Sequence, residues 1–257
     1  MQMRREWNVT KPVIAIVGAG PGLGLAVARR FGQAGYAAAL IARRQGALDL
    51  MVAELNGEGI LAQGFVADII DEAALKRALQ EARSSLGPIS VVQFSPVPAP
   101  EGDGSEYTPT GLDRATMDRL HKLVILGAIT TVREVLPAMQ SSGGGSIFLT
   151  TSGSAHHVMP VYTPVGMTMA GLRSYGLCLH EVLQAAGVYV ATVCIGVLIR
   201  KGDPVGDPAV LADHYFRLHK ERAVAEEMIF DSADLNALHD RDMAERGLEW
   251  RRPETAE

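Results

Sequence analysis

Cysteine is scarce in this chain, which has two, Cys178 and Cys194, among 257 residues. Both lie inside apolar segments, and their separation does not match the spacing of a metal site. The sequence therefore predicts two buried free thiols and no bound metal. Aromatic residues are also few, at 5%, whereas alanine, glycine, valine and leucine abound. That balance is typical of helices packed closely on a parallel sheet.

The sequence has neither an excess of positive charge nor a long hydrophobic run. Its net charge is −5 at pH 7, and its pairs of basic residues are short and far apart, which argues against a nucleic-acid partner. The longest apolar run, residues 188–199, is too short to cross a bilayer as a helix. Residues 1–11 carry charge without the apolar core of a signal peptide. We therefore expect a cytoplasmic protein without a membrane partner.

What the sequence does contain is enough apolar material for a sizeable core. Hydrophobic residues make up 47% of the chain, and the mean hydropathy is +0.11. The length suits one large α/β domain, and no internal repeat, low-complexity tract or linker divides it. We predict a single domain over residues 1–257, in which roughly residues 240–257 form a loosely held, highly charged tail.

Apolar runs of strand length alternate with amphipathic segments of helix length along the chain. This alternation predicts a doubly wound parallel sheet with helices on both faces, a Rossmann-like α/β fold. The Pro- and Gly-rich residues 95–110 are expected to be loop. We expect strands at residues 12–17, 37–42, 61–66, 89–94, 146–151 and 188–195, and a seventh, edge strand at 226–230. We expect helices at 23–34, 71–86, 112–139 (ending near Pro137), 164–186 and 208–222, and another helix that follows the second strand and ends at about residue 56.

The first predicted strand runs directly into a glycine-rich turn, GAGPGLG, which opens a helix. Glycines let the backbone turn tightly and approach a pyrophosphate, and a helix N-terminus offers unpaired N–H groups at the positive end of its dipole. Between the first strand and first helix of a repeating βα chain, the pattern predicts dinucleotide binding. A merely tight turn is the alternative. The residues of the turn are Gly18, Ala19, Gly20, Pro21, Gly22, Leu23 and Gly24.

With glycines at 18, 22 and 24, the chain resembles the short-chain dehydrogenase/reductase family, and the resemblance extends over nearly its whole length. It implies a nicotinamide cofactor. A carboxylate after the second strand would favour NAD(H), but Arg43 and Arg44 stand there. Arginines pair with a 2′-phosphate through charge-assisted hydrogen bonds, so the resemblance implies NADP(H) rather than NAD(H). An exposed arginine pair without a ligand is the alternative.

Other positions fit the same cofactor by resemblance. Asp68 matches an aspartate that lies near the adenine ring, and Arg200 stands where the family often places a threonine on the cofactor phosphates. The resemblance also implies a homodimer or homotetramer, with the helices from about 112 and 164 paired across an axis. Their leucines suit that interface or the core equally. The expected cofactor-binding residues are Gly18, Gly20, Pro21, Gly22, Leu23, Gly24, Arg43, Arg44, Asp68, Ile69, Ser95, Gly196 and Arg200.

The catalytic residues that the resemblance implies are only partly present. In the family, a serine after the fifth strand acts with a tyrosine thirteen residues later and a lysine four beyond that. The lysine lowers the pKa of the tyrosine, which transfers the proton. Ser152 fits the serine, but Val165 and Met169 occupy the other two positions. An expected asparagine is replaced by Val124. The tyrosine–lysine proton relay therefore cannot operate here.

Three neighbouring side chains are candidates for the missing proton donor. His156 and His157 follow Ser152 on a loop that borders the substrate in the family, and histidines ordinarily titrate near pH 6.5. Solvated loop histidines are the alternative. Tyr162 is expected just outside the next helix, with Thr163 as its N-cap, and to line the cleft. Ser152 either donates a hydrogen bond to a carbonyl or simply ends its strand.

Two classes of function remain. The first is an NADP(H)-dependent oxidoreductase that acts on a small organic carbonyl, imine or enone with a non-standard proton donor. The second is a redox-inactive relative, acting as a nucleotide sensor or scaffold, or as an isomerase or lyase that uses the histidines. Fold alone does not decide between them. The preserved cofactor turn favours the first.

Overall fold

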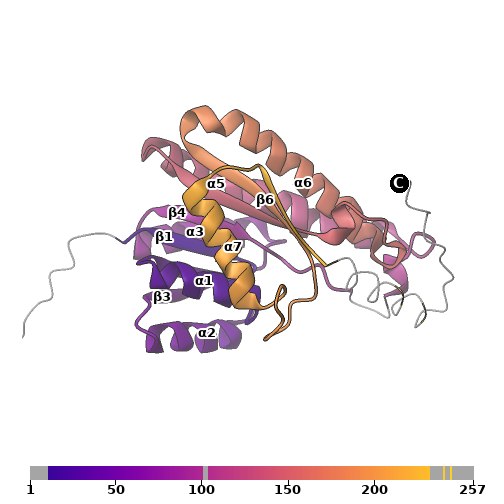
Figure 1. The fold of residues 1–257 in the computed structure, drawn as a ribbon, viewed down its shortest axis with the longest axis horizontal. Helices are drawn as coiled ribbons and strands as arrows, with labels where there is room; N and C mark the ends of the chain where they lie inside the picture. The colour runs from indigo at the N-terminus through magenta and orange to yellow at the C-terminus, as the bar shows by residue number, and fades with distance from the viewer. Residues whose placement is uncertain (1–10, 101–103, 232–239, 241–243, 245–257) are drawn as a thin grey trace, which may run out of the picture.

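The sheet has seven strands, all parallel, in the order β3-β2-β1-β4-β5-β6-β7, and helices cover both faces (Figure 1). The computed structural model describes residues 11–100, 104–231, 240 and 244. The doubly wound fold predicted from the sequence is thus confirmed. The predicted polar tail at 240–257 lies outside the described residues except for Asp240 and Ala244.

Each strand begins and ends within one residue of its predicted bounds. The inner strands are buried on both faces, because helices pack against each side, and they are accordingly mostly apolar, with a few buried polar residues such as Gln93 and Ser146. β7 pairs with β6 at one edge, as expected for the seventh strand. The strands are β1 Val13–Val17, β2 Ala37–Ala42, β3 Ala62–Val66, β4 Ile89–Phe94, β5 Gly145–Ser152, β6 Val188–Gly196 and β7 Glu226–Phe230.

The helices form two layers, each with its own apolar core against the sheet. One layer contains α1 (Leu23–Gln33), α2 (Gln45–Gly57) and α7 (Pro208–Glu221), which lie in front of the sheet in Figure 1. The other contains α3, α5 and α6. α3 spans Glu72–Leu86, α5 spans Gly127–Ser141 and α6 spans Thr163–Leu183.

The predicted helix from 112 to 139 differs from expectation in two ways. It consists of α4 (Arg114–Leu120), a π-helical turn η2 (His121–Leu126) and α5, and it continues past Pro137 to Ser141. By length and composition alone, residues 114–141 would suffice to cross a membrane. In this fold, however, α5 packs on α3, β4 and β5, and η2 packs on α6, which accounts for the apolar face.

Two smaller expectations need correction, and the alternative left open for the helix leucines is decided in favour of the core. Cys194 is buried but Cys178 is exposed, because it lies on the outer side of α6. Residues 95–110 include a short 3-10 turn, η1 (Ser105–Tyr107), which buries the ring of Tyr107. The leucines that suited either core or interface belong to the core. Leu120, Leu172 and Leu183 are buried, and Leu123 and Leu179 pack against them.

Candidate functional site

The glycine-rich turn lies between β1 and β4, where the strand order reverses, and ligands of open α/β sheets bind at such a point. Gly18 has φ +88°, and a Cβ there would lie 2.9 Å from the Pro96 nitrogen. The Ser95 amide donates to the Val17 carbonyl at 2.9 Å. The turn and the segment after β4 are therefore in direct contact, which only glycine at position 18 permits.

The N-terminus of α1 is open to an anion. Its N-cap is Gly22, no side chain caps it, and its first turn contains no acidic residue. A Cβ at Gly20 or Gly22 would meet no atom within 4 Å, whereas one at Gly24 would lie 3.1 Å from Ile16 Cγ2. The first two glycines thus leave space over the backbone, and the third allows α1 to pack closely on β1. This arrangement fits a pyrophosphate, with the helix dipole and free amides facing it. Pro21 is exposed and Leu23 is buried beside these glycines.

The ends of β2 and β3 place the other predicted cofactor residues beside this turn. The amides of Gly18 and Ala19 both donate to the Ile41 carbonyl, at 3.0 and 2.9 Å, so β2 ends next to the turn. Arg43 and Arg44 follow it, and their exposed side chains make no hydrogen bond or ion pair with another described residue. Their charges are thus available to a ligand.

Asp68 and Ile69 follow β3 in the same region. One carboxylate oxygen of Asp68 accepts a hydrogen bond from the Ile70 amide at 3.1 Å, which holds the side chain close to the C-terminal end of β3. Ile69 is buried over Gly127, where a Cβ would lie 2.3 Å from Ile69 Cγ2. The close approach of β3's end to α5 therefore depends on glycine at position 127.

Gly196 and Arg200, at the other end of the predicted cofactor site, have partners within the protein. A Cβ at Gly196 would lie 2.7 Å from the ring of Phe230, the last residue of β7. Arg200 pairs with Asp203 at 3.0 Å. Backbone N–H groups of Gly206 and Val205 hold the pKa of Asp203 below its ordinary value, with a smaller contribution from Arg200. Arg200 is thus less available to a phosphate than the arginines after β2.

Apolar side chains fill the interior where the family resemblance places the proton relay. Val165 and Met169 on α6 are 6% and 4% exposed, and Val124 on η2 is fully buried. Ser152, at the end of β5, lies beside this region, and its hydroxyl is 2.7 Å from that of Ser154. Among these positions the serine alone offers a polar group.

A cleft of about 480 Å³ lies over the start of α6. Three of the four predicted catalytic residues border it, namely His156, His157 and Tyr162, while Ser152 reaches it only through its contact with Ser154. The expected N-cap is wrong by one residue, since α6 begins at Thr163, whose hydroxyl donates to the Pro160 carbonyl. The lining is Pro109, Ser154, Ala155, His156, His157, Val158, Met159, Pro160, Tyr162, Thr163, Gly166 and Met167.

His156 is held in this cleft by two residues that the sequence did not reveal. Its Nε2 lies 3.1 Å from Oε1 of Glu226 on β7. Arg173 on α6 donates to both oxygens of Glu226, at 2.7 Å each. Burial opposes ionisation of Glu226, but the hydrogen bonds and charges of Arg173 and His156 keep its pKa below the ordinary value. Arg173 lies one helical turn beyond Met169, the position of the family lysine, and therefore on the same face of α6. This i, i+4 spacing is the sequence signal that could have identified Arg173.

His157 is exposed, and its ring packs against the edge of Phe230, with centroids 5.0 Å apart. The ring of His156 also approaches Phe230, at 6.3 Å. β7 therefore contributes both a carboxylate and an aromatic ring to the loop that borders the cleft. Of the two histidines, His156 is the one held by a charged partner.

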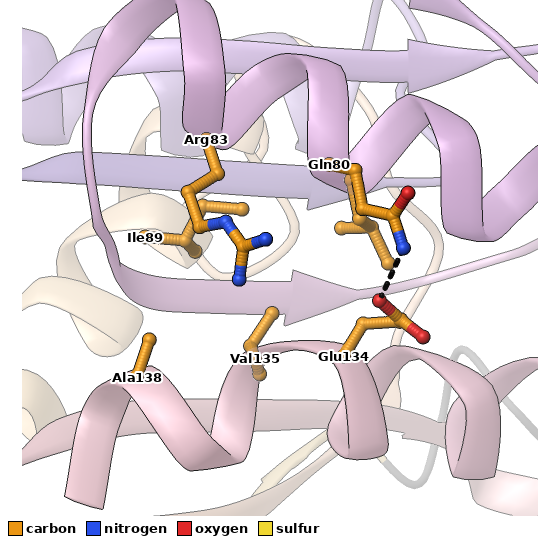
Figure 2. A pocket seen from close by; sticks show the side chains of 7 residues that line it. Gln80, Arg83, Ile89, Glu134, Val135 and Ala138 are labelled. Atoms are coloured by element: carbon orange, nitrogen blue, oxygen red, sulfur yellow. Dashed lines mark hydrogen bonds between the residues drawn. The ribbon is translucent and has the colours of Figure 1, made fainter. Parts of the chain in front are cut away.

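Figure 2 shows a second hollow, between α3 and α5, which is too small for a substrate. Its volume is about 10 Å³, roughly enough for one water. Gln80 donates to Glu134 across it at 3.1 Å. Within residues 11–100 and 104–231 no group of three His, Cys, Asp or Glu side chains is arranged to hold a metal ion.

The sheet order, the open glycine turn and the cleft beyond it define a dinucleotide-binding α/β protein. The profile of the short chain dehydrogenase family matches residues 12–199. Oxidoreductase asL5 of Sarocladium schorii is 30% identical over 184 residues, covering 71% of this chain and 70% of the relative. A short chain dehydrogenase of Pseudocercospora fijiensis is 27% identical over 173 residues, covering 67% and 55%. The chain belongs to the short-chain dehydrogenase/reductase family.

Solved structures share the fold at lower identity. The L-sorbose reductase of Gluconobacter frateurii, complexed with NADPH and L-sorbose, has a TM-score of 0.76 and 20% identity, covering 88% of this chain and 97% of that one. A 3-oxoacyl-[acyl-carrier protein] reductase of Brucella melitensis with bound NAD has a TM-score of 0.77 and 19% identity, covering 88% and 92%. Family members bind a nicotinamide cofactor, typically act on small molecules and are often oligomeric.

Proposed function

We propose that this protein is an NADP(H)-dependent oxidoreductase that acts on a small organic carbonyl, imine or enone, with His156 in place of the tyrosine as the proton-transfer group. The observation that carries the proposal is the position of His156. It borders the 480 Å³ cleft and is paired with the ionised Glu226. The open glycine turn supports the cofactor half of the proposal.

The residues present fit the cofactor. Gly18, Gly20 and Gly22, with the uncapped start of α1, would hold the pyrophosphate, and Asp68 and Ile69 would border the adenine. Arg43 and Arg44 would pair with a 2′-phosphate, because both are exposed cations without a described partner and no carboxylate stands at the end of β2. NADP(H) is therefore favoured over NAD(H). When bound, the nicotinamide supplies or accepts the hydride.

The protein's own residues would manage the proton. His156 borders the space that a substrate would occupy, and an imidazole side chain can act as a general acid or base. Ser152, already bonded to Ser154, would orient the substrate oxygen. Tyr162 and the apolar side chains that line the cleft would shape the site.

The test is titration with NADPH and NADH, followed by nicotinamide fluorescence, and then a panel of carbonyl, imine and enone substrates. We expect NADPH to bind tightly, and turnover to fall by a factor of about 10² to 10⁴ in His156→Gln. His157→Gln, a neighbour without a carboxylate partner, is the matched control and should retain most activity. If the protein binds neither NADPH nor NADH at millimolar concentration, the proposed oxidoreductase function is refuted.

One observation favours a second candidate. The apolar filling by Val124, Val165 and Met169 leaves no relay of the family type. A redox-inactive nucleotide sensor or scaffold, or an isomerase or lyase that uses the histidines, would need none. Binding of NADPH without turnover of any redox substrate would support this candidate instead.

We also infer a homodimer or homotetramer. The outer sides of the long helices expose Leu126, Met167 and Val182, at 44%, 55% and 70%, and these differ from the leucines that fill the core. Light scattering of the purified protein would measure the assembly. Substitution of Met167 and Val182 by glutamate should shift it toward the monomer.

A further inference from the structure

We propose that Glu226 and Arg173 are positioning residues that hold His156 as the tautomer with its proton on Nε2, so that Nδ1 exchanges the proton with a molecule in the cleft. The inference deepens the proposed function and rests on it for its catalytic part. Its structural part, the tautomer, is measurable whether or not the protein is an oxidoreductase.

The three side chains come from three separate elements. Arg173 stands on α6, Glu226 opens β7, and His156 follows the 3-10 turn after β5. The side chains of Glu226 and His156 are 15% and 16% exposed. Arg173 binds the carboxylate with two parallel hydrogen bonds of 2.7 Å, which fix its plane as well as its place. The carboxylate is thus held in place by a partner other than the histidine.

Hydrogen-bond chemistry then assigns the tautomer. An ionised carboxylate accepts hydrogen bonds and donates none. The contact of 3.1 Å between Glu226 Oε1 and His156 Nε2 therefore requires a proton on Nε2. A neutral imidazole has one such proton, so its lone pair lies on Nδ1, which makes no hydrogen bond with another described residue. Nδ1 is the nitrogen left for a ligand in the cleft.

The charged side chains beside His156 form a balanced pair. The ion pair of Arg173 and Glu226 is neutral in sum, and a proton taken up at Nδ1 would leave the Nε2–H group still donating to the carboxylate. Burial raises the pKa of Cys194, on β6 beneath the pair, to about 11, so that thiol stays uncharged at neutral pH. The ring of Phe230 lies on another side of His156, with centroids 6.3 Å apart. Glu226 is the charged group that contacts His156 directly.

A purely structural role is the competing explanation, because an ion pair also fastens the edge strand β7 to α6. The molecule contains its own control for that explanation. On the opposite face of β7, Glu227 contacts Arg217 and lies 2.8 Å from Nδ1 of His214 on α7. This second trio has the same chemistry and faces away from the cleft. A fastening role predicts similar effects for both trios, whereas a positioning role predicts effects at Glu226 alone.

The first test is a long-range proton–nitrogen NMR correlation on the full chain with isotope-labelled histidine, with the His156 signals assigned through His156→Gln. We expect a protonated Nε2 and an unprotonated Nδ1 above neutral pH. Glu226→Gln should abolish this single preference, and Glu226→Asp should partly restore it. Glu227→Gln should leave it intact. A wild-type proton on Nδ1, or a tautomer unchanged in Glu226→Gln, overturns the proposal. If Glu226→Gln does not fold, the wild-type tautomer decides alone, since a proton on Nδ1 overturns the proposal.

The second test is kinetic. Glu226→Gln should lower kcat of NADPH-dependent reduction about 10- to 100-fold, with KM for NADPH unchanged, and should move the alkaline limb of the pH–rate profile to lower pH. Glu227→Gln should move neither. Equal losses in the two variants would establish a fastening role and overturn the positioning role. If the wild type reduces no substrate, the proposed function fails, while the NMR test still decides the tautomer.

Discussion

Gly18 lies so close to Pro96 that a Cβ at position 18 would come within 2.9 Å of the proline nitrogen. The two residues follow β1 and β4, the neighbouring strands at which the order of the sheet reverses. Contact between the two segments fixes the shape of the crevice between them. The conformation of the glycine-rich turn is therefore set by packing within the protein itself.

This contact predicts different effects for two neighbouring glycines. Gly18→Ala places a side chain at φ +88° and against backbone atoms, so it should lower the free energy of unfolding by about 1–3 kcal/mol in urea titrations. Gly20→Ala meets no atom within 4 Å and should leave stability nearly unchanged. The second variant should instead weaken NADPH binding, because its methyl group enters the pyrophosphate space. Equal stability losses would show that the contact is not tight.

The choice of cofactor is tested at Arg43. Arg43→Ala should weaken NADPH by about 10- to 100-fold, the worth of a charge-assisted hydrogen bond, and NADH far less. Arg200→Ala is the comparison, because its side chain is already paired with Asp203. It should affect both cofactors equally and weakly. Equal weakening of NADPH and NADH by Arg43→Ala argues against recognition of the 2′-phosphate.

The elements were predictable because local patterns decide them. Strand-length apolar runs bounded by turns located every strand, and the glycine turn located the crevice. The local rule that a proline ends a helix fails at one position. Pro137 was expected to end its helix, but tertiary packing of α5 on the sheet keeps four more residues helical. Exposure of Cys178 was likewise missed, since apolar neighbours in sequence do not tell which side of a helix faces out.

The pairing of Arg173 with Glu226 could not be read from the sequence. The two residues are 53 positions apart and meet only because β7 runs parallel to β6 at the sheet edge. His156 was a candidate by its place in the loop, but nothing local distinguished it from His157. The distinction arises from the alternation of β7, which turns Glu226 and Phe230 to one face and Glu227 to the other.

The family lysine cannot simply be restored. Met169 is 4% exposed, among apolar neighbours, and Arg173 lies one turn away. Met169→Lys would bury an ammonium group among apolar neighbours without a carboxylate of its own, so the free energy of unfolding at pH 7 should fall by about 3 kcal/mol or more. Met169→Leu, of similar volume, should cost less than about 1.5 kcal/mol. The lysine deficit should shrink at high pH, where the amine is neutral. A deficit independent of pH would indicate a steric cause.

A partly buried histidine, His219, makes stability depend on pH. His219 lies 2.8 Å from the Ser146 hydroxyl through Nδ1 and 2.8 Å from the Tyr36 hydroxyl through Nε2. Burial, with smaller contributions from Arg222 and Lys220, lowers its pKa from 6.5 to about 4. Between these values the unfolded chain binds a proton that the folded chain does not. The free energy of unfolding should therefore fall as the pH falls from 6.5 to 4, by roughly 1–3 kcal/mol from this residue.

Carboxylates titrate in part of the same range, so the contribution of His219 must be isolated by difference. Urea unfolding of the wild type and of His219→Gln should be measured at intervals from pH 7 to pH 4. The variant should be the less stable at pH 7, because the Ser146 and Tyr36 hydroxyls lose a partner, but its stability should decline less steeply. The two curves should therefore converge on acidification. Parallel curves would mean that His219 is protonated to the same extent in both states, and that the hydroxyl pair does not keep it neutral.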